Sequence, residues 1–75
     1  MRWIVENHLT DNVLGLYEAD SAREAIDKAY QARGWKDFAD AREQRATAAE
    51  EHEIKARQVD DNGVQFGPFV GYSEA

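Results

Sequence analysis

The sequence predicts a small α+β domain, an antiparallel sheet of hairpins with one or two helices packed on one face, in the order ββα(α)ββ. Three observations lead to this fold class. Two short β-type runs come first, a helix marked by capping residues follows, and an Asn-Gly turn separates two further β-type runs. At 75 residues the chain is expected to form a single domain, residues 1–75, in which residues 66–75 are a loosely packed tail.

The first two strands are expected over residues 2–9, "RWIVENHL", and residues 13–19, "VLGLYEA". The intervening "TDN" is short enough to make them an antiparallel hairpin. Strict alternation predicts that Leu14 and Leu16 share one face of the second strand. Gly15 between them indicates a bulge or a close backbone approach.

The stretch "SAREAIDKAYQARGW", which begins at Ser21, predicts a helix with both ends marked. Ser21 is expected to accept a hydrogen bond from the N–H of Glu24, and the Glu24 carboxylate to reach back to the N–H of Ser21, as in a capping box. Gly34 suits the left-handed position of a Schellman motif, with Trp35 covering Tyr30. Apolar residues at three- and four-residue intervals predict a stripe that packs on the sheet: Ala22, Ala25, Ile26, Ala29 and Tyr30.

A second helix is expected over residues 37–51, "DFADAREQRATAAEE", with Asp37 as its N-cap. Alanine, glutamate, glutamine and arginine, which dominate this stretch, are good helix formers. Phe38 is its only large apolar side chain. We therefore expect this helix to be exposed along much of its length, and to fray or to order only against a partner.

The last part of the chain is expected to form a second hairpin. Residues 53–59, "EIKARQV", have helix-forming propensity, but their alternation favours a strand. Asn62 and Gly63 predict a type I′ turn, followed by a last strand over "VQF" that ends at Gly67-Pro68. Three apolar residues of the tail either pack back on the domain or contact a partner: Phe69, Val70 and Tyr72.

No pattern in the sequence indicates a catalytic, cofactor or metal site. "HEIKA" begins like the zinc-binding His-Glu-x-x-His motif, but Ala56 stands where the second histidine belongs. Aligning "QVDDNG" with a calcium loop puts Gln58 at the first ligand position and Phe69 at that of the bidentate glutamate. The absence of cysteine removes disulfides and thiolate ligands. We expect no enzyme activity, no cofactor and no metal.

The chain carries a formal net charge of −6, from 15 acidic and 9 basic residues. This balance argues against direct nucleic-acid binding and favours a protein partner with a basic surface. The basic residues Arg42, Arg45, Lys55 and Arg57 are expected to pair with neighbouring acids, or to form a mixed-charge protein interface. With no signal-peptide core and no run of about 20 apolar residues, a cytoplasmic protein without a membrane contact is expected.

Residues 14–41, "LGLYEADSAREAIDKAYQARGWKDFADA", resemble a hairpin-to-helix unit found in small proteins of phages, prophages and mobile elements. The chain also looks like the scaffold of anti-CRISPR proteins, which are short, often acidic, poor in cysteine and non-enzymatic. That resemblance implies a protein of the bacterial host cytosol that blocks a nucleoprotein surveillance complex. HicB-type antitoxins share the hairpin-helix start, but the glycine-rich "GY" strand pair expected of them is not apparent.

The first functional hypothesis is therefore a phage-encoded, anti-CRISPR-like inhibitor that blocks a basic surface of a nucleoprotein effector complex. Its partner-binding residues are the acids of the second helix and its exit: Asp37, Asp40, Glu43, Glu50, Glu51 and Glu53. The alternative is a homo-oligomeric structural protein or antitoxin-like regulator, a homodimer in the simplest case. In that alternative the aromatic residues near the end pair the copies: Phe66, Phe69 and Tyr72.

Overall fold

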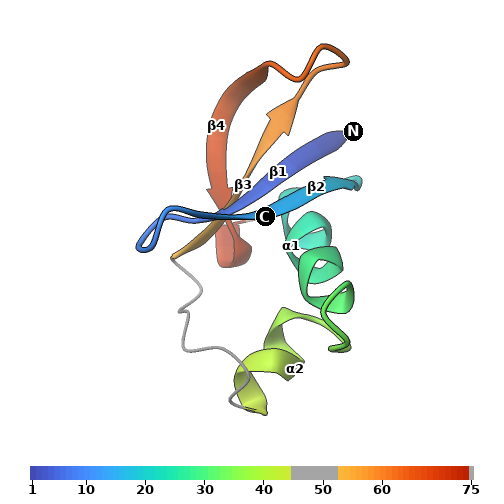
Figure 1. Cartoon of the computed structure of the whole chain (residues 1–75), viewed down its shortest axis with the longest axis vertical. Helices are drawn as coiled ribbons and strands as arrows, with labels where there is room; N and C mark the ends of the chain where they lie inside the picture. The colour runs from blue at the N-terminus through green and yellow to red at the C-terminus, as the bar shows by residue number, and fades with distance from the viewer. Residues whose placement is uncertain (45–52, 75) are drawn as a thin grey trace.

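Four antiparallel strands form one sheet in the order β2-β1-β3-β4 (Figure 1). The computed structural model describes residues 1–44 and 53–74. The two central strands are β1 (Arg2–Asn7) and β3 (Ile54–Val59). The edge strands are β2 (Asn12–Glu18) and β4 (Gln65–Gly71).

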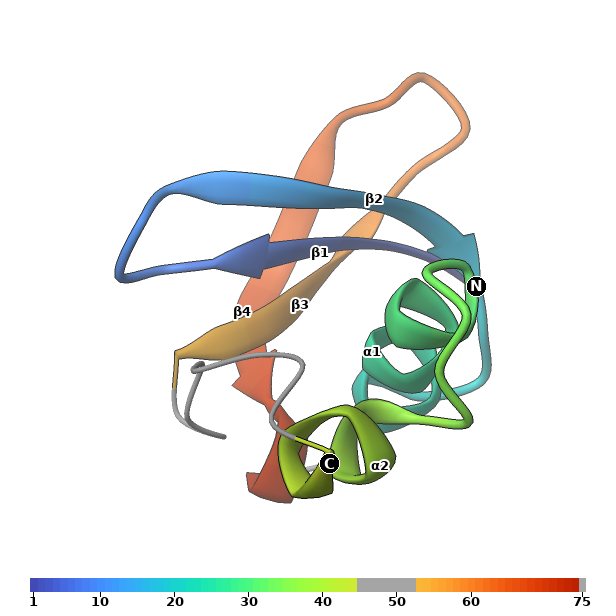
Figure 2. The same ribbon diagram turned by 60° about the horizontal axis from the view of Figure 1, so that its bottom comes forward.

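Two helices and a short 3₁₀ helix complete the described structure. The longer helix, α1 (Ala22–Gln31), lies across one face of the sheet and contacts all four strands, as Figure 2 shows. Helix α2 (Phe38–Glu43) packs on α1, and η1 (Tyr72–Glu74) follows β4 and also contacts α1. The α+β class and the ββα(α)ββ order predicted from the sequence are confirmed.

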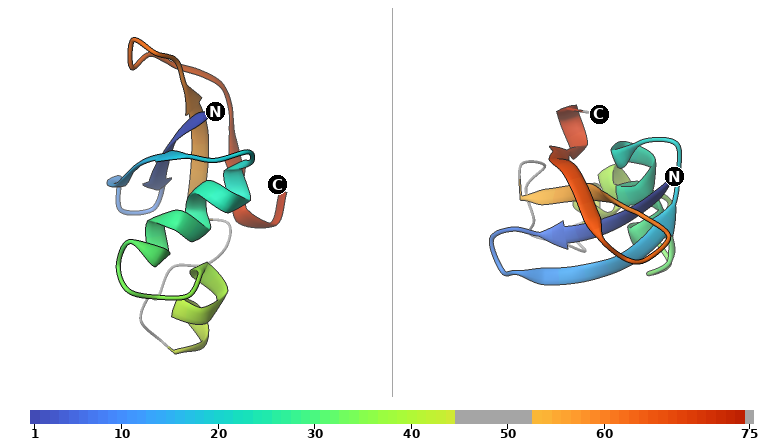
Figure 3. Two further views of the ribbon diagram at one scale, coloured as in Figure 1. Left: turned by 90° about the vertical axis from the view of Figure 1, so that its right-hand side faces the viewer. Right: turned by 90° about the horizontal axis from the view of Figure 1, so that it is seen from above.

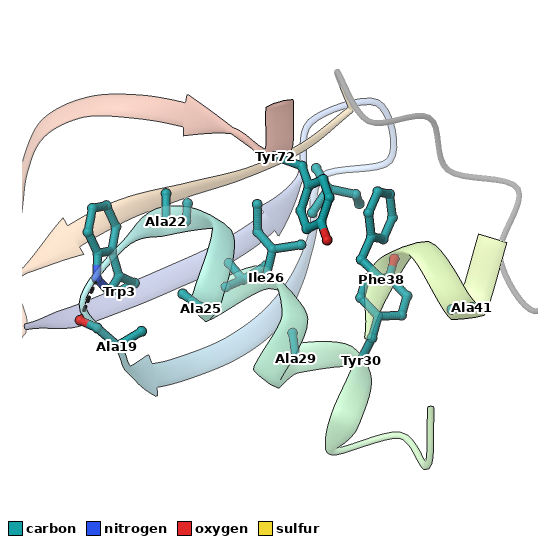
Figure 4. Close-up of a cluster of buried hydrophobic side chains, with 13 residues drawn as sticks. Trp3, Ala19, Ala22, Ala25, Ile26, Ala29, Tyr30, Phe38, Ala41 and Tyr72 are labelled. Atoms are coloured by element: carbon teal, nitrogen blue, oxygen red, sulfur yellow. Dashed lines mark hydrogen bonds between the residues drawn. The ribbon is translucent and has the colours of Figure 1, made fainter. Parts of the chain in front are cut away.

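The core lies between α1 and the face of the sheet that it covers (Figure 4). Ile26 of α1 and Val5 of β1 are fully buried, and so are the two β3 residues Ile54 and Ala56. The indole Nε1 of Trp3 donates to the carbonyl of Ala19 over 3.1 Å, which ties β1 to the chain just before α1. The predicted stripe of α1 is buried throughout, with three alanines that let the helix lie close to the strands: Ala22, Ala25 and Ala29.

Both ends of α1 carry the predicted capping motifs, with one difference. The Ser21 hydroxyl accepts from the N–H of Glu24 over 3.1 Å, as expected. The Glu24 carboxylate, however, accepts from the N–H of Asp20 over 3.1 Å, so its expected bond to Ser21 is wrong by one residue. At the other end, the N–H of Trp35 bonds to the carbonyl of Tyr30 over 3.1 Å, the Schellman bond that the sequence predicts.

A β-bulge on β2 changes which side chains share a face. Val5 of β1 pairs with Gly15 and Glu6 pairs with Val13, which leaves Leu14 as the extra residue. Gly15 has φ +137°, a conformation that favours glycine. Leu14 packs against the core, whereas Leu16 is 55% exposed. The predicted bulge is confirmed, and the prediction that the two leucines share a face is wrong because of it.

Helix α2 begins where the sequence predicts. The Asp37 carboxylate accepts from the N–H of Asp40 over 2.7 Å, which confirms the N-cap. Phe38 is fully buried. The helix ends at Glu43, and the rest of the predicted span, residues 45–51, lies outside the described residues.

The turn between β3 and β4 has a different geometry from the predicted type I′ turn. A type I′ turn needs positive φ at both central residues, but Gly63 has φ +82° whereas Asn62 does not lie in that region. The Asp60 carboxylate accepts from the N–H groups of Asn62 and Val64, each over 2.9 Å. This local bonding by Asp60 stabilises a wider turn, so the predicted turn type is wrong.

The last strand runs through Gly67-Pro68, where the sequence predicts its end. Proline is tolerated there because β4 is an edge strand and the pairing is irregular between Ala56 and Gln58. Beyond this point Val70 packs against the core and Tyr72 is 3% exposed. Val70 and Tyr72 therefore pack back on the domain, which is the first of the two alternatives for the tail.

Candidate functional site

The face of the sheet opposite α1 carries no helix of the described chain, as Figure 3 shows. Leu16, Ile4 and Arg57 lie side by side across it, because each is the pairing partner of the next. Paired residues point to the same side of a sheet, and their neighbours in sequence point to the other. We call this surface the open face, and its defining residues are Ile4, Val13, Leu16, Lys55, Arg57 and Phe69.

The part of the open face on β1 and β2 is apolar and accessible. Val13 is 57% exposed and Leu16 is 55% exposed. Ile4, next to Leu16 on β1, is half-buried. Exposed apolar residues that are neighbours on a rigid sheet form a patch, which is more informative than the same residues scattered over a surface.

The part of the open face on β3 and β4 is cationic and aromatic. The Arg57 Nε donates to the carbonyl of Gly67 over 2.8 Å, and its Nη1 donates to Oε1 of Gln65 at 3.5 Å. The guanidinium lies over Phe69, 5.2 Å from the ring centroid, and His8 meets the same ring edge-on with centroids 4.4 Å apart. These contacts hold the guanidinium in a defined orientation on the open face.

Neither cation of β3 has an acidic partner within the described structure. Lys55 lies opposite Glu6, but the Glu6 carboxylate contacts the ring of His8, with 3.5 Å between a carboxylate oxygen and Nε2. Arg57 lies opposite Ile4 and bonds only to a carbonyl and an amide. Among the described residues the expected pairing of Lys55 and Arg57 with acids is not observed, while Glu50 and Glu51, two of the neighbouring acids, lie outside the described residues. The mixed-charge interface stays the other expectation for these two cations.

The acids predicted to bind a partner are divided between structural roles and the surface. Asp37 caps α2, and the Asp40 carboxylate accepts from the N–H of Lys36 over 3.1 Å. Glu43 is exposed at the end of α2. Glu53 is half-buried just before β3, and its carbonyl accepts from the N–H of His8 over 2.8 Å. The structure brings Asp37, Asp40 and Glu43 together on α2, while Glu50 and Glu51 lie outside the described residues.

The aromatic residues predicted to pair two copies are also divided. Phe66 is 45% exposed and remains available for such a contact. Phe69 is half-buried on the open face between Arg57 and His8. Tyr72 is buried in the core, so it is unavailable for pairing in this fold.

A hydrogen-bonded carboxylate joins α1, α2 and η1 beside the core. Oδ1 of Asp27 accepts from the Tyr72 hydroxyl over 2.8 Å and from the N–H of Phe38 over 3.1 Å. Burial of the ring, followed by the hydrogen bond to Asp27, raises the pKa of Tyr72 from 10.0 to about 12. The hydrogen bonds of Asp27 therefore hold α2 and η1 to α1.

The raised pKa predicts a loss of stability in alkaline solution. The folded protein favours the protonated hydroxyl of Tyr72, so this stabilisation is fully present below about pH 10 and is lost as the pH rises towards 12. We expect a tyrosinate absorbance titration to show one tyrosine with a pKa near 12, and Tyr72→Phe to lack that step. In the variant the free energy of unfolding should fall less steeply over this pH range. Equal slopes for the two proteins would contradict the assignment.

Other parts of the described chain offer little for chemistry. No group of three or more His, Asp or Glu side chains in residues 1–44 and 53–74 is placed to hold a metal ion. A hollow of about 360 Å³ lies where Arg2 and Glu18 meet the β3–β4 turn at Asp60. Arg2 and Glu18 pair with each other there, with 3.4 Å between Nε and Oε1. No helix within the described ranges is both long and apolar enough to span a membrane.

Comparison with known proteins gives no relative for the chain: no protein-family model, no curated protein and no solved structure matches it. The open face therefore has to be judged from its own geometry and charges.

The open face was missed in the sequence, although part of its signal is there. Alternation in "EIKARQV" already places Lys55 and Arg57 on the side opposite Ile54 and Ala56. The bulge at Gly15, which turns Leu16 towards the same surface, could be suspected from the glycine but not located to a register.

Proposed function

We propose that this protein is a non-enzymatic interaction module that binds another protein and inhibits it by covering one of its surfaces. The observation that carries the proposal is the open face, on which Val13 and Leu16 are more than half exposed. The same face carries Arg57, which has no acidic partner among residues 1–44 and 53–74. The sheet beneath it is braced by α1, so the surface is held in shape before any partner arrives. A preformed surface loses little conformational entropy when it binds.

The finer proposal is an anti-CRISPR-like inhibitor of a nucleoprotein effector complex, acting in the cytosol of a bacterial host. It is supported by the net charge of −6 and by the exposed Glu43 at the end of α2, which suit a basic site on the complex. In this proposal the acids of α2 and its exit oppose the basic channel that otherwise holds nucleic acid.

Capture from nuclease-treated bacterial lysate, followed by assays with the purified partner, tests the function. We expect a nucleoprotein effector in stoichiometric amount, and inhibition of its nucleic-acid binding by the purified protein. Glu43→Lys is expected to weaken inhibition by about tenfold, because a repulsive pair replaces an attractive one. Asp61→Lys, the same charge change on the exposed β3–β4 turn, is the matched control and should change it less than about twofold.

The acids at the exit of α2 give a second arm of the test: Glu50 and Glu51, which lie outside the described residues, and Glu53, which lies just before β3. Simultaneous replacement of Glu50, Glu51 and Glu53 by lysine should abolish binding if these residues meet a basic surface. Unchanged binding of that variant would contradict the role of the acids, whichever partner is recovered.

Self-association is the second candidate function, and it is favoured by the exposed Val13, Leu16 and Phe66. A second copy that covers them would give a structural or regulatory assembly. Light scattering at micromolar concentration separates the candidates, because we expect a monomer for the inhibitor and a dimer or larger species for the assembly.

A further inference from the structure

We propose that the open face is where the partner docks, and that it takes a protein surface presenting a carboxylate beside apolar side chains. The carboxylate pairs with Arg57 while the apolar side chains cover Ile4, Leu16 and Val13. This inference rests on the proposed function and goes further, because it names the docking surface and the chemistry of the group that it recognises.

The first argument is the unused bonding capacity of Arg57. A guanidinium has five N–H donors in a planar fork that fits a carboxylate with two parallel bonds. Within the described chain, Nε and Nη1 bond to Gly67 and Gln65, and Nη2 makes no hydrogen bond. Because the ring of Phe69 lies under the guanidinium plane of Arg57, the Nη2 side of the guanidinium is already oriented and needs little reordering to bind an anion.

The second argument is the apolar surface next to this cation. Ile4 separates Arg57 from Leu16 on the sheet, since it pairs with both. Strands lie about 4.8 Å apart, so the backbones of Arg57 and Leu16 are roughly 10 Å apart across the open face. The guanidinium bonds to Gly67 and Gln65 of β4, on the side of β3 away from Leu16, so a complementary surface carries its carboxylate more than about 10 Å from the apolar side chain that covers Leu16. An apolar contact over Ile4, which pairs with Arg57, excludes water closer to the ion pair and strengthens it.

The charges of the open face favour a single carboxylate over a nucleic-acid backbone. Glu6 lies opposite Lys55, and Glu18 lies opposite Arg2 with its carboxylate 3.4 Å from the guanidinium. A polyanion crossing the sheet would meet these acids, whereas one carboxylate placed on Arg57 would not. Phe69, with Arg57 over its face and His8 at 4.4 Å, is not free to stack with bases.

The edge of β2 is a less suitable docking site than the face. The bulge at Gly15 interrupts the row of backbone groups that a new strand needs. The carbonyl of Leu14 is also occupied, because it accepts from the Tyr17 hydroxyl over 3.1 Å and from Nη2 of Arg33 over 3.2 Å. The side chains of the open face therefore offer a partner a better contact than strand addition at β2 does.

A second copy of the chain is a poorer occupant than a different protein. Each copy carries a net charge of −6, so two copies repel each other as they approach. Docking of a different, carboxylate-bearing surface that is less acidic overall avoids this cost.

Selection from a displayed library of random peptides on the wild-type protein tests the inference. We expect enriched peptides to carry Asp or Glu near apolar residues, and to lose at least about tenfold in affinity with Arg57→Gln, because a charge-assisted bond is lost. Lys36→Gln removes one positive charge from an exposed position between α1 and α2, and it should change the affinity less than about twofold. Leu16→Ser should weaken binding several-fold without altering the charge.

Chemical-shift mapping on the wild-type protein keeps the test decisive if Arg57→Gln fails to fold. We expect the bound peptide to perturb Ile4, Leu16 and the Nε–H of Arg57. Four outcomes would each overturn the inference. The enriched peptides could lack acids, or the perturbations could be confined to α1 and α2. The open face could also bind single-stranded oligonucleotides, or be buried in a dimer. An inhibited partner that depends on Glu43 and tolerates Arg57→Gln would overturn it too, and would leave the proposed function standing.

Discussion

Phe38→Ala is expected to lower the free energy of unfolding by about 3–5 kcal/mol, the usual cost of removing a buried aromatic ring. Phe38 is fully buried, and its ring lies between those of Tyr30 and Tyr72, with centroids 5.0 and 4.8 Å away. Together with the buried Ala41, the ring joins α2 to the core. A chain of this size has a total stability of about 4–11 kcal/mol, so the variant is expected to lose a large part of it.

Urea denaturation followed by circular dichroism measures this effect. Phe38→Leu, which keeps most of the apolar volume, serves as the control and should cost about half as much or less. A loss below about 1 kcal/mol for Phe38→Ala would mean that α2 does not contribute to the cooperative core. Loss of only the aromatic near-ultraviolet signal, with unfolding unchanged, would point to the same conclusion.

Gly15→Ala is expected to destabilise the protein by about 1–3 kcal/mol, the range for a side chain forced into a rarely populated backbone region. Gly15 has φ +137°, and a Cβ at this position would lie 2.8 Å from Oη and 2.9 Å from Cε2 of Tyr17. Tyr17 cannot move away freely, because its hydroxyl donates to the carbonyl of Leu14. The substitution therefore acts on both the backbone and the bulge.

Gly67→Ala separates these two effects. Gly67 has φ +75°, and a Cβ there would meet no other atom within 4 Å, so its cost comes from the backbone alone. We expect it to be the milder of the two changes in thermal and urea denaturation. Gly15→Ala should also weaken binding at the open face, since the bulge directs Leu16 there. Equal stability losses for both variants would show that Tyr17 adapts to the new side chain.

The sequence predicted the fold best at motifs that are compatible with only one backbone conformation. Ser21 and Gly34 mark the two ends of α1, and both capping motifs occur where expected. The errors occur where the same residues are compatible with two different local conformations. Asn62-Gly63 suits a type I′ turn, but the Asp60 carboxylate satisfies the same backbone groups and selects another turn. Gly67-Pro68 breaks most strands, but on an edge the missing N–H has no partner to lose.

The candidate site was less predictable because it depends on pairing between distant strands. In the sequence, Arg57 has acids nearby. Only the pairing register between β1 and β3 places Arg57 opposite Ile4. The Glu6 carboxylate of the same face lies against His8. Likewise the acids Asp37 and Asp40 have the charge of a binding surface, while the structure commits their carboxylates to hydrogen bonds around α2. Whether a charged group is free or engaged is decided by tertiary contacts that no local pattern contains.

The strand order has a consequence for how the chain folds as it is synthesised. β1 and β2 can pair and receive α1 early, because these elements are neighbours in sequence. One side of β1 must nevertheless wait for β3, which begins at Ile54, and the ring of Phe38 stays uncovered until Tyr72 arrives. Closing these distant contacts is the slow step expected of the folding reaction. A ribosome therefore has to release the chain as far as Tyr72 before this domain can reach its native state. Termination before that residue should yield fragments that proteases remove rather than a smaller working protein.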